Sequence, residues 1–196
     1  MLVYNVEHPG REMNWSGAYI LDTNVLAALQ FPHIKWKQEK VAAYSGFILK
    51  LLENNATLYV STLSLQELYH LAEKIAYNHY CIVNELRQKQ FRQKQYRKIV
   101  SEREKLAETL QAIHSVIAEQ FSLIEEHITI QDTQNFINAY AKHSYDPMDF
   151  LLIEHNLKRC KNVITDDKDF QIDSRLNIFC YRPEVRIKEK EQGAFS

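Results

Sequence analysis

An apolar run is interrupted by a charge in AYILDTNVLAAL, residues 18–29. The first four residues have the composition of a short buried strand. Asp22 follows directly, and after Asn24 the apolar residues resume with a spacing typical of a helix. Packing alone requires no carboxylate here, although an Asp can also cap the helix that follows. The stretch therefore predicts a strand-to-helix turn that carries an acid.

The composition favours one intracellular domain. The chain has 196 residues, of which 45% are hydrophobic, and this is enough for one sizeable core. A formal net charge of -1 argues against a uniformly basic nucleic-acid-binding protein, although a local basic patch can be hidden in that sum. The three cysteines lack the spacing of a disulfide framework or a metal finger. Because neither a signal peptide nor a membrane span is visible, we expect a cytoplasmic protein that does not enter a membrane.

The distribution of glycine and proline predicts a long helical interior. Neither residue occurs between Gly46 and Pro147, so this part of the chain lacks the usual turn signals of an all-β fold. Its apolar spacing predicts a long helical segment at about 65–122, folded as two helices packed in a hairpin. We expect one domain at 17–182, with an N-terminal extension at 1–16 and a charged C-terminal tail at 183–196.

Strands and helices alternate in the rest of the predicted domain. Ser64 and Glu67 have the spacing of a capping box, and Pro147 is a typical first-turn residue, so helices should begin near both places. Another helix is expected around 133–143. Further strands are expected at 57–63, near 127–130, at 162–165 and at 176–181. This alternation predicts an α/β fold in which helices flank a central parallel sheet.

Ligands of parallel sheets bind outside the carboxyl ends of the strands. Several acids of this sequence occur at such positions. Asp22 closes one predicted strand, Asp166 and Asp167 close another, and Glu67 and Asp149 lie near helix starts. Each acid alone could simply complement a helix dipole. Several convergent carboxylates would repel one another unless a cation neutralised them. Oxygen ligands without convergent His or Cys point to magnesium or manganese.

At these positions the chain resembles the PIN-domain ribonucleases, in particular their VapC-type toxins. ILDTNVL at 20–26 resembles the motif that carries the first acid, and STLSLQEL at 61–68 resembles the segment that carries the glutamate. DPMDFLLIEHNL at 146–157 and VITDDKDF at 163–170 resemble the motifs of the third and fourth acids. The resemblance assigns the catalytic and metal-binding positions to Asp22, Glu67, Asp149 and Asp167, with Asn24 and Thr165 in support.

The resemblance also implies a fold and a reaction. The fold is a three-layer PIN-like domain whose first and fourth strands are adjacent, so that Asp22 lies beside Asp167. The reaction is cleavage of single-stranded or loop RNA with Mg²⁺ or Mn²⁺, commonly by the toxin of a toxin–antitoxin pair. RNA is then the substrate, and an antitoxin protein and a second copy of the chain are candidate partners.

Several alternatives remain open on the sequence alone. Asp146 could take the place of Asp149, and Asp166 could take that of Asp167, although strand alternation puts Asp167 on the same face as Thr165. The chain could also be a noncatalytic PIN-like module that binds RNA or protein. An aspartyl-phosphate phosphatase is disfavoured, because Asn24 stands where that family needs its second Asp.

A basic segment, RQKQFRQKQYRK at 87–98, contains six cations and no acid. Read as a helix, its two similar units do not share one face, so the cations would surround the helix. We expect an RNA-binding surface in which Phe91 or Tyr96 stacks on a base. Its proposed phosphate contacts are Arg87, Lys89, Arg92 and Lys94. The alternative is a solvated helix face.

Overall fold

Six parallel strands form the centre of the molecule. The computed structural model describes residues 2–10, 13–32, 37–140 and 147–182. Within these ranges the strand order is β1-β6-β5-β2-β3-β4, and every strand pair is parallel. The strands are β1 (Leu2–Asn5), β2 (Ala18–Leu21), β3 (Thr57–Ser61), β4 (Ser122–Ile124), β5 (Asn162–Ile164) and β6 (Asn177–Cys180). The expected α/β class with a central parallel sheet is confirmed.

Helices follow most strands, as they must when parallel strands are joined by crossovers. Their bounds are α1 (Thr23–Gln30), α2 (Gln38–Glu53), α3 (Thr62–Val83), α4 (Gln93–Tyr96), α5 (Val100–Gln120), α6 (Ile130–Tyr140) and α7 (Pro147–Leu157). A short 3₁₀ helix, η1 (Asp169–Ile172), precedes β6. In the described part of the chain, no helix combines the length and apolar character needed to cross a membrane.

The sheet has a separate hydrophobic core on each face. Ile164 and Phe179 belong to a core shared with α1, α2, α3 and α5. Val163 and Ile178, one residue earlier on the same two strands, belong to a core shared with α7 and η1. Because successive side chains of a strand point to opposite faces, this alternation gives three layers of helix, sheet and helix.

The position of β2 determines where a ligand can bind. The chain leaves β2 toward β3 and β4 on one side and returns to β5 and β6 on the other. In parallel sheets the crevice at such a reversal, outside the carboxyl ends of the strands, is the usual ligand site. The turns that follow β2 and β5 therefore lie side by side, as the family resemblance implied.

Part of the segment that we expected as an N-terminal extension, at 1–16, adds a strand to the sheet. Leu2–Asn5 forms the edge strand β1 and pairs with β6 in the register Val3 with Ile178. An edge strand of four residues has too short a pattern to be recognised without its partner. The tail expected at 183–196 lies outside the described residues.

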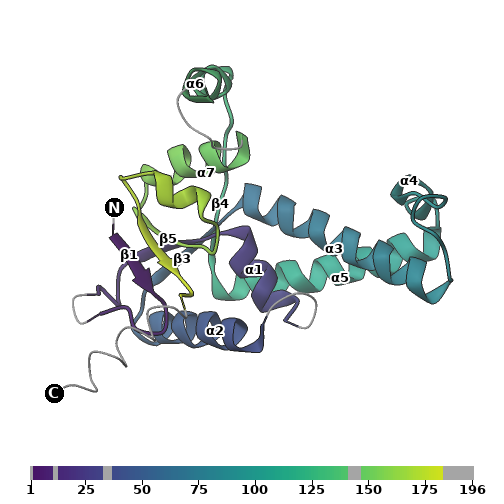
Figure 1. The fold of residues 1–196 in the computed structure, drawn as a ribbon, viewed down its shortest axis with the longest axis horizontal. Coiled ribbons are helices and arrows are strands. Elements are labelled where there is room, and N and C mark those ends of the chain that lie inside the picture. Colours follow the sequence, from purple (N-terminus) through teal and green to yellow (C-terminus); the bar gives the residue numbers. More distant parts are fainter. Residues whose placement is uncertain (1, 11–12, 33–36, 141–146, 183–196) are drawn as a thin grey trace.

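The helical hairpin expected at about 65–122 is present. Helices α3 and α5 pack against each other and project away from the sheet, with α4 at the far end (Figure 1). The hairpin begins earlier than the Ser64 cap predicted, because the Ser61 hydroxyl accepts a hydrogen bond from the Leu63 N–H at 3.1 Å and starts α3 at Thr62. Ser64 is therefore inside the helix.

Two boundaries after the hairpin also differ from expectation. The strand expected near 127–130 lies instead at Ser122–Ile124, where it pairs with β3 in the register Val60 with Leu123. The helix expected around 133–143 begins at Ile130. Its described part ends at Tyr140, and residues 141–143 lie outside the described ranges. The strand is fixed by its pairing with β3, a tertiary contact. The start of α6 is fixed locally, because the Thr129 N–H donates to Asp132 and the Asp132 N–H donates to the Thr129 hydroxyl.

Candidate functional site

Asp22 lies at the crevice between β2 and β5 and is almost completely buried, with 6% of its surface exposed. Its Oδ1 accepts a hydrogen bond from the Thr23 N–H at 2.6 Å. Its Oδ2 accepts from Asn24 Nδ2 and from the Thr165 hydroxyl, both at 2.6 Å. Asp22 thus caps α1, which is the purely structural role that the sequence allowed. It also joins two turns that are far apart in the sequence.

The surroundings of Asp22 oppose its negative charge. Burial raises the pKa of Asp22 to about 7, although the hydrogen bonds from Thr165 and Thr23 act in the opposite direction. The negative charges of Glu67 and Asp167 raise this pKa further. A carboxylate that is buried close to two others is stabilised in its charged form by a neighbouring cation.

Thr165 is fully buried and links Asp22 to Asp167. Its hydroxyl donates to Asp22 and accepts a hydrogen bond from the Asp167 N–H at 2.9 Å. Asn24 makes a parallel link, because its Oδ1 accepts from the Asp166 N–H at 3.1 Å. The turn after β5 is therefore held against the turn after β2 by the two residues that the sequence assigned to supporting roles.

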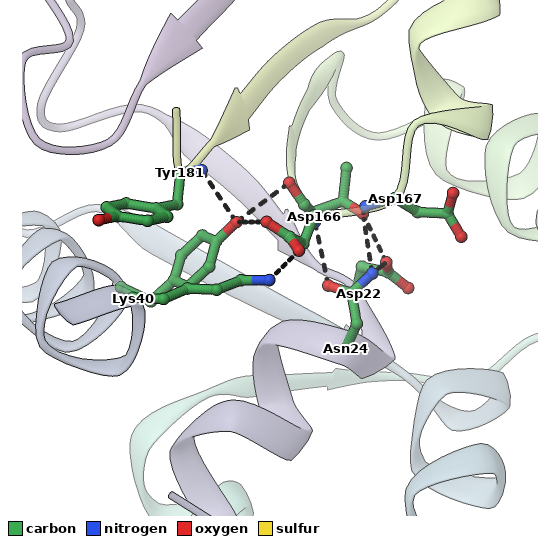
Figure 2. A network of polar contacts seen from close by, with 8 residues as sticks. Asp22, Asn24, Lys40, Asp166, Asp167 and Tyr181 are labelled. Carbon is green, nitrogen blue, oxygen red and sulfur yellow. Dashed lines mark hydrogen bonds and ion pairs between the residues drawn. The ribbon is translucent and has the colours of Figure 1, made fainter. Parts of the chain in front are cut away.

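Asp166 and Asp167 point in opposite directions from this turn (Figure 2). Asp166 faces α2, where Lys40 forms an ion pair with it and the Tyr44 hydroxyl donates to it at 3.0 Å. The Tyr44 hydroxyl in turn accepts from the Tyr181 N–H at 3.1 Å. Asp166 therefore anchors the turn to α2 and β6, and the side chain that faces away from this network is that of Asp167.

Three carboxylates converge on the side of the turn that Asp167 faces. Oxygen atoms of Asp149, Asp167 and Asp169 all lie within 4.8 Å of one another. Asp149 is in the first turn of α7, and Asp169 begins η1 with its N–H donating to Asp167 Oδ1 at 2.9 Å. We call these three residues the acid cluster. Its donors are all hard oxygens, which fit Mg²⁺ or Mn²⁺ rather than zinc.

The acid cluster overlaps only partly with the four acids assigned from the sequence. Asp149 and Asp167 belong to it, whereas Asp22 and Glu67 lie nearby and interact with each other electrostatically. Glu67 Oε2 accepts from the Thr23 hydroxyl at 2.5 Å. It lies one turn further into α3 than expected, because α3 starts at Thr62.

Asp169 was not selected from the sequence. The one signal that could have found it is its position two residues after Asp167, in the same turn that leaves β5. Its position beside Asp149 and Asp167 depends on η1, which is too short to predict from a pattern of apolar residues. The competing residue Asp146 lies outside the described residues.

The basic segment at 87–98 is not the continuous helix that we expected. Arg87, Lys89, Arg92 and Lys94 are exposed at the far end of the hairpin, on irregular turns and the four-residue helix α4. Helix α3 ends with Glu85 in a left-handed conformation, at φ 53°, and the Leu86 N–H donates to the Cys81 carbonyl at 2.8 Å. This helix termination normally uses glycine, so the absence of glycine concealed the turn.

The aromatic residues of the basic segment pack on the hairpin itself. Tyr96 is buried, and both Phe91 and Tyr96 contact Tyr77 and Tyr80. Tyr96 is therefore not available to stack on a base, as we had expected of one of the two rings. Both rings instead form part of a small core beneath the cations.

Comparisons with known proteins identify the family and the fold. The sequence profile of the PIN domain family matches residues 19–172. A chain of the solved structure "Crystal structure of VapBC2 from Rickettsia felis bound to a DNA fragment from their promoter" is similar to this one, with a TM-score of 0.50 at 15% sequence identity. The similarity covers 84% of this chain and 99% of that chain. No curated protein sequence matches significantly. Since the profile spans most of the sequence, including every element from β2 to η1, the chain belongs to the PIN domain family.

Proposed function

We propose that this protein is a metal-dependent endoribonuclease that hydrolyses phosphodiester bonds in single-stranded or loop RNA. The observation that carries the proposal is the convergence of Asp149, Asp167 and Asp169 within 4.8 Å of one another, beside the buried Asp22. Three carboxylates so close together favour a divalent cation among them. The membership of the chain in the PIN domain family supports the same conclusion.

The residues of the site fit Mg²⁺ or Mn²⁺. The acid cluster would hold the ion, and Glu67 could reach the same region from α3, where the Thr23 hydroxyl orients its carboxylate. Asp22 would add a negative charge from its buried position at the end of β2. When bound, the ion would supply Lewis acidity toward the phosphate and toward an attacking water.

The protein's own groups would fix the geometry of hydrolysis. Water adds to phosphorus and one P–O ester bond breaks, so the attacking and leaving oxygens must be held in line. Thr165 restrains Asp22 and the backbone of Asp167 together. The Lys40 and Tyr44 contacts of Asp166 hold the same turn from the other side. These contacts would keep Asp167 directed at the ion while substrate binds.

The test is RNA cleavage by the purified protein with Mg²⁺, with Mn²⁺ and with excess EDTA. Cleavage should need a metal, and Asp167→Asn should abolish it. Glu108→Gln is the matched control, because it removes one negative charge from an exposed position on α5. Absence of metal-dependent cleavage from the wild-type protein, while RNA binding is retained, would favour the noncatalytic alternative.

We also propose an antitoxin partner. The support is the fold similarity to a chain of the VapBC2 structure from Rickettsia felis, in which the complex is bound to a promoter DNA fragment. The test is expression of this protein with and without the product of a small adjacent gene. Growth arrest that the wild-type protein causes, that Asp167→Asn does not cause and that the adjacent product relieves would support the pairing, whereas growth without arrest would contradict it. A homodimer is tested separately, by light scattering during size-exclusion chromatography.

A further inference from the structure

The far end of the hairpin concentrates positive charge. We call residues 84–99, which connect α3 to α5 and include α4, the hairpin tip. Within the described residues, no ion pair involves five exposed cations of the tip, which are Arg87, Lys89, Arg92, Lys94 and Lys98. Arg97 is different, because it pairs with Glu73 on α3. In a chain with a formal net charge of -1, the tip is therefore a locally basic surface.

A small core of its own supports the hairpin tip. Tyr77, Cys81 and Tyr96 are buried together, away from both cores of the sheet. The Tyr77 hydroxyl donates to the Phe91 carbonyl at 2.5 Å, and the Arg92 N–H donates to Gln95 Oε1 at 2.7 Å. The cations thus extend from a packed and hydrogen-bonded base rather than from an unsupported loop.

Helix α3 connects the tip to the candidate active site. Glu67 lies in α3 at the site end, and Val83, the last residue of the helix, follows it by sixteen residues. At about 1.5 Å of rise per residue, the tip is about 24 Å from Glu67. In Figure 1, α3 runs from the sheet to the hairpin tip at α4. One phosphate cannot contact both, but two phosphates of one RNA can.

We infer that the hairpin tip is a second phosphate-binding surface for the RNA whose scissile bond lies at the acid cluster. The inference rests on the proposed ribonuclease function and narrows its substrate class. Stacked nucleotides advance about 3.4 Å each along a strand, so about seven of them span the distance. The substrate is therefore an RNA that extends at least this far from the cleavage site, such as a folded RNA with a cleaved loop, rather than a short oligonucleotide.

Charge favours RNA over a protein partner at this surface. The acid cluster repels a polyanion, so a nuclease with such a site needs cations elsewhere to hold its substrate. The tip supplies five cations that form no ion pair within the described part of the chain. Ile82, Val83 and Val100 are exposed close by and could suit a protein instead, and the experiment below includes that outcome.

The experiment compares two quadruple variants. The tip variant carries Arg87→Gln, Lys89→Gln, Arg92→Gln and Lys94→Gln. The control variant removes the same charge from exposed positions near the amino ends of the strands, with Lys50→Gln, Lys158→Gln, Arg159→Gln and Lys161→Gln. Thermal melting verifies that both variants fold. The substrates are RNAs that share one mapped cleavage site and extend from it by 2, 6, 10 or 14 nucleotides.

For the wild-type protein and the control variant, KM should fall once the extension reaches about seven nucleotides, while kcat stays constant. The tip variant should lose this dependence on length. A wild-type KM that is independent of length, or a tip variant that keeps the dependence, would overturn the inference without affecting the proposed nuclease. In the latter case the tip is a solvated or protein-binding surface.

A binding measurement tests the hairpin tip independently of cleavage. If no RNA is cleaved, the proposed nuclease activity is contradicted, but RNA binding by the tip can still be measured. The probe is fluorescein-labelled 16-nucleotide oligouridylate in EDTA, with affinity measured by anisotropy at several salt concentrations. Each lost single-strand phosphate contact lowers the magnitude of the negative slope of log affinity against log salt by about 0.7. The tip variant should therefore lower it by up to about 3. An unchanged slope and affinity would show that the tip does not bind RNA.

Discussion

The two ends of α3 carry opposite charges in opposite surroundings. At the site end, Asp22 is buried and influenced by Glu67 and Asp167, and hydrogen bonds from neighbouring turns hold it in place. At the other end, the cations of the hairpin tip are exposed above a cluster of aromatic rings. Buried like charges interact strongly, whereas water and salt screen exposed ones. We therefore expect the site end to respond to pH and metal, and the tip to respond to salt and packing.

The largest effect should come from removing the buried charge at the site end. Asp22→Asn keeps the size of the side chain but takes away a negative charge beside the proposed ion. We expect metal-dependent RNA cleavage to fall by about a thousandfold or more, as for loss of a group that holds a catalytic metal in place. The measurement is kcat/KM on one RNA, with circular dichroism to show that the fold survives.

The activities of Asn variants at three other acids test the assignment of the acid cluster. Asp149→Asn should lower activity far more than Asp146→Asn, because Asp149 belongs to the acid cluster. Asp169→Asn should resemble Asp149→Asn. Full activity in Asp22→Asn, or a larger loss in Asp146→Asn than in Asp149→Asn, would show that the acids have been assigned wrongly.

The second effect is on stability in the absence of metal. The pKa of Asp22 is raised by burial to about 7, so between about pH 4 and pH 7 the folded state binds a proton that the unfolded state has released. Stability from this group therefore falls as pH rises through that window. In EDTA, the wild-type protein should lose about 3 kcal/mol more than Asp22→Asn between pH 5 and pH 8.

Urea unfolding of both proteins at the two pH values measures this difference. Added Mg²⁺ should raise the stability of the wild-type protein at pH 8, because the ion binds only the folded state, and should raise that of the variant much less. Parallel pH dependences in EDTA would mean that the Asp22 carboxylate is not disfavoured by its surroundings.

The third effect tests the hydroxyl that joins the two turns. Thr165→Val keeps the shape of the side chain but removes its hydrogen bonds to Asp22 and Asp167. Residues that orient metal-binding groups typically contribute tenfold to a hundredfold in activity or metal affinity. We expect a loss in this range, together with weaker Mg²⁺-dependent stabilisation. Thr165→Ser restores the hydroxyl and should recover most of both.

The smallest effect belongs to the tip. Tyr77→Phe removes the hydrogen bond to the Phe91 carbonyl but keeps the ring packing. Backbone amides of the tip should exchange with solvent about twofold to tenfold faster, while those of the sheet stay unchanged. Faster exchange throughout the sheet would show that the tip and the sheet do not behave as separate units.

Sequence patterns predicted the elements whose residue types alone indicate both the secondary structure and the burial that the fold gives them. Ala18–Leu21 is apolar up to Asp22, and the strand does end there. The adjacency of β2 and β5 was implied by the family resemblance rather than by any residue pattern. The exclusion of Asp166 from the acid cluster depends on Lys40 and Tyr44, which come from a helix that the sequence analysis did not identify.

The features that were missed have specific physical causes. The chain reverses after α3 with Glu85 in a conformation that usually needs glycine, so the basic segment looked like a continuous helix. The edge strand β1 exists because β6 pairs with it, and β4 is placed by β3. Asp169 joins the acid cluster only through a single 3₁₀ turn. The two strands depend on contacts between distant residues, which a local pattern does not contain, whereas the Glu85 turn and the 3₁₀ turn are local but lack the usual residue signal.

The hydrogen bond between Asp22 and Thr165 joins residues 143 positions apart. During synthesis β2, α1 and the whole hairpin leave the ribosome before the turn after β5 has been made, and early segments of a chain can fold before late ones. The partial chain would already display its basic tip while Asp22 lacked Thr165, Asp167 and Asp169. The nascent protein would thus present its proposed RNA-binding surface well before its proposed metal site is complete, and a chain interrupted before Thr165 would have the first without the second.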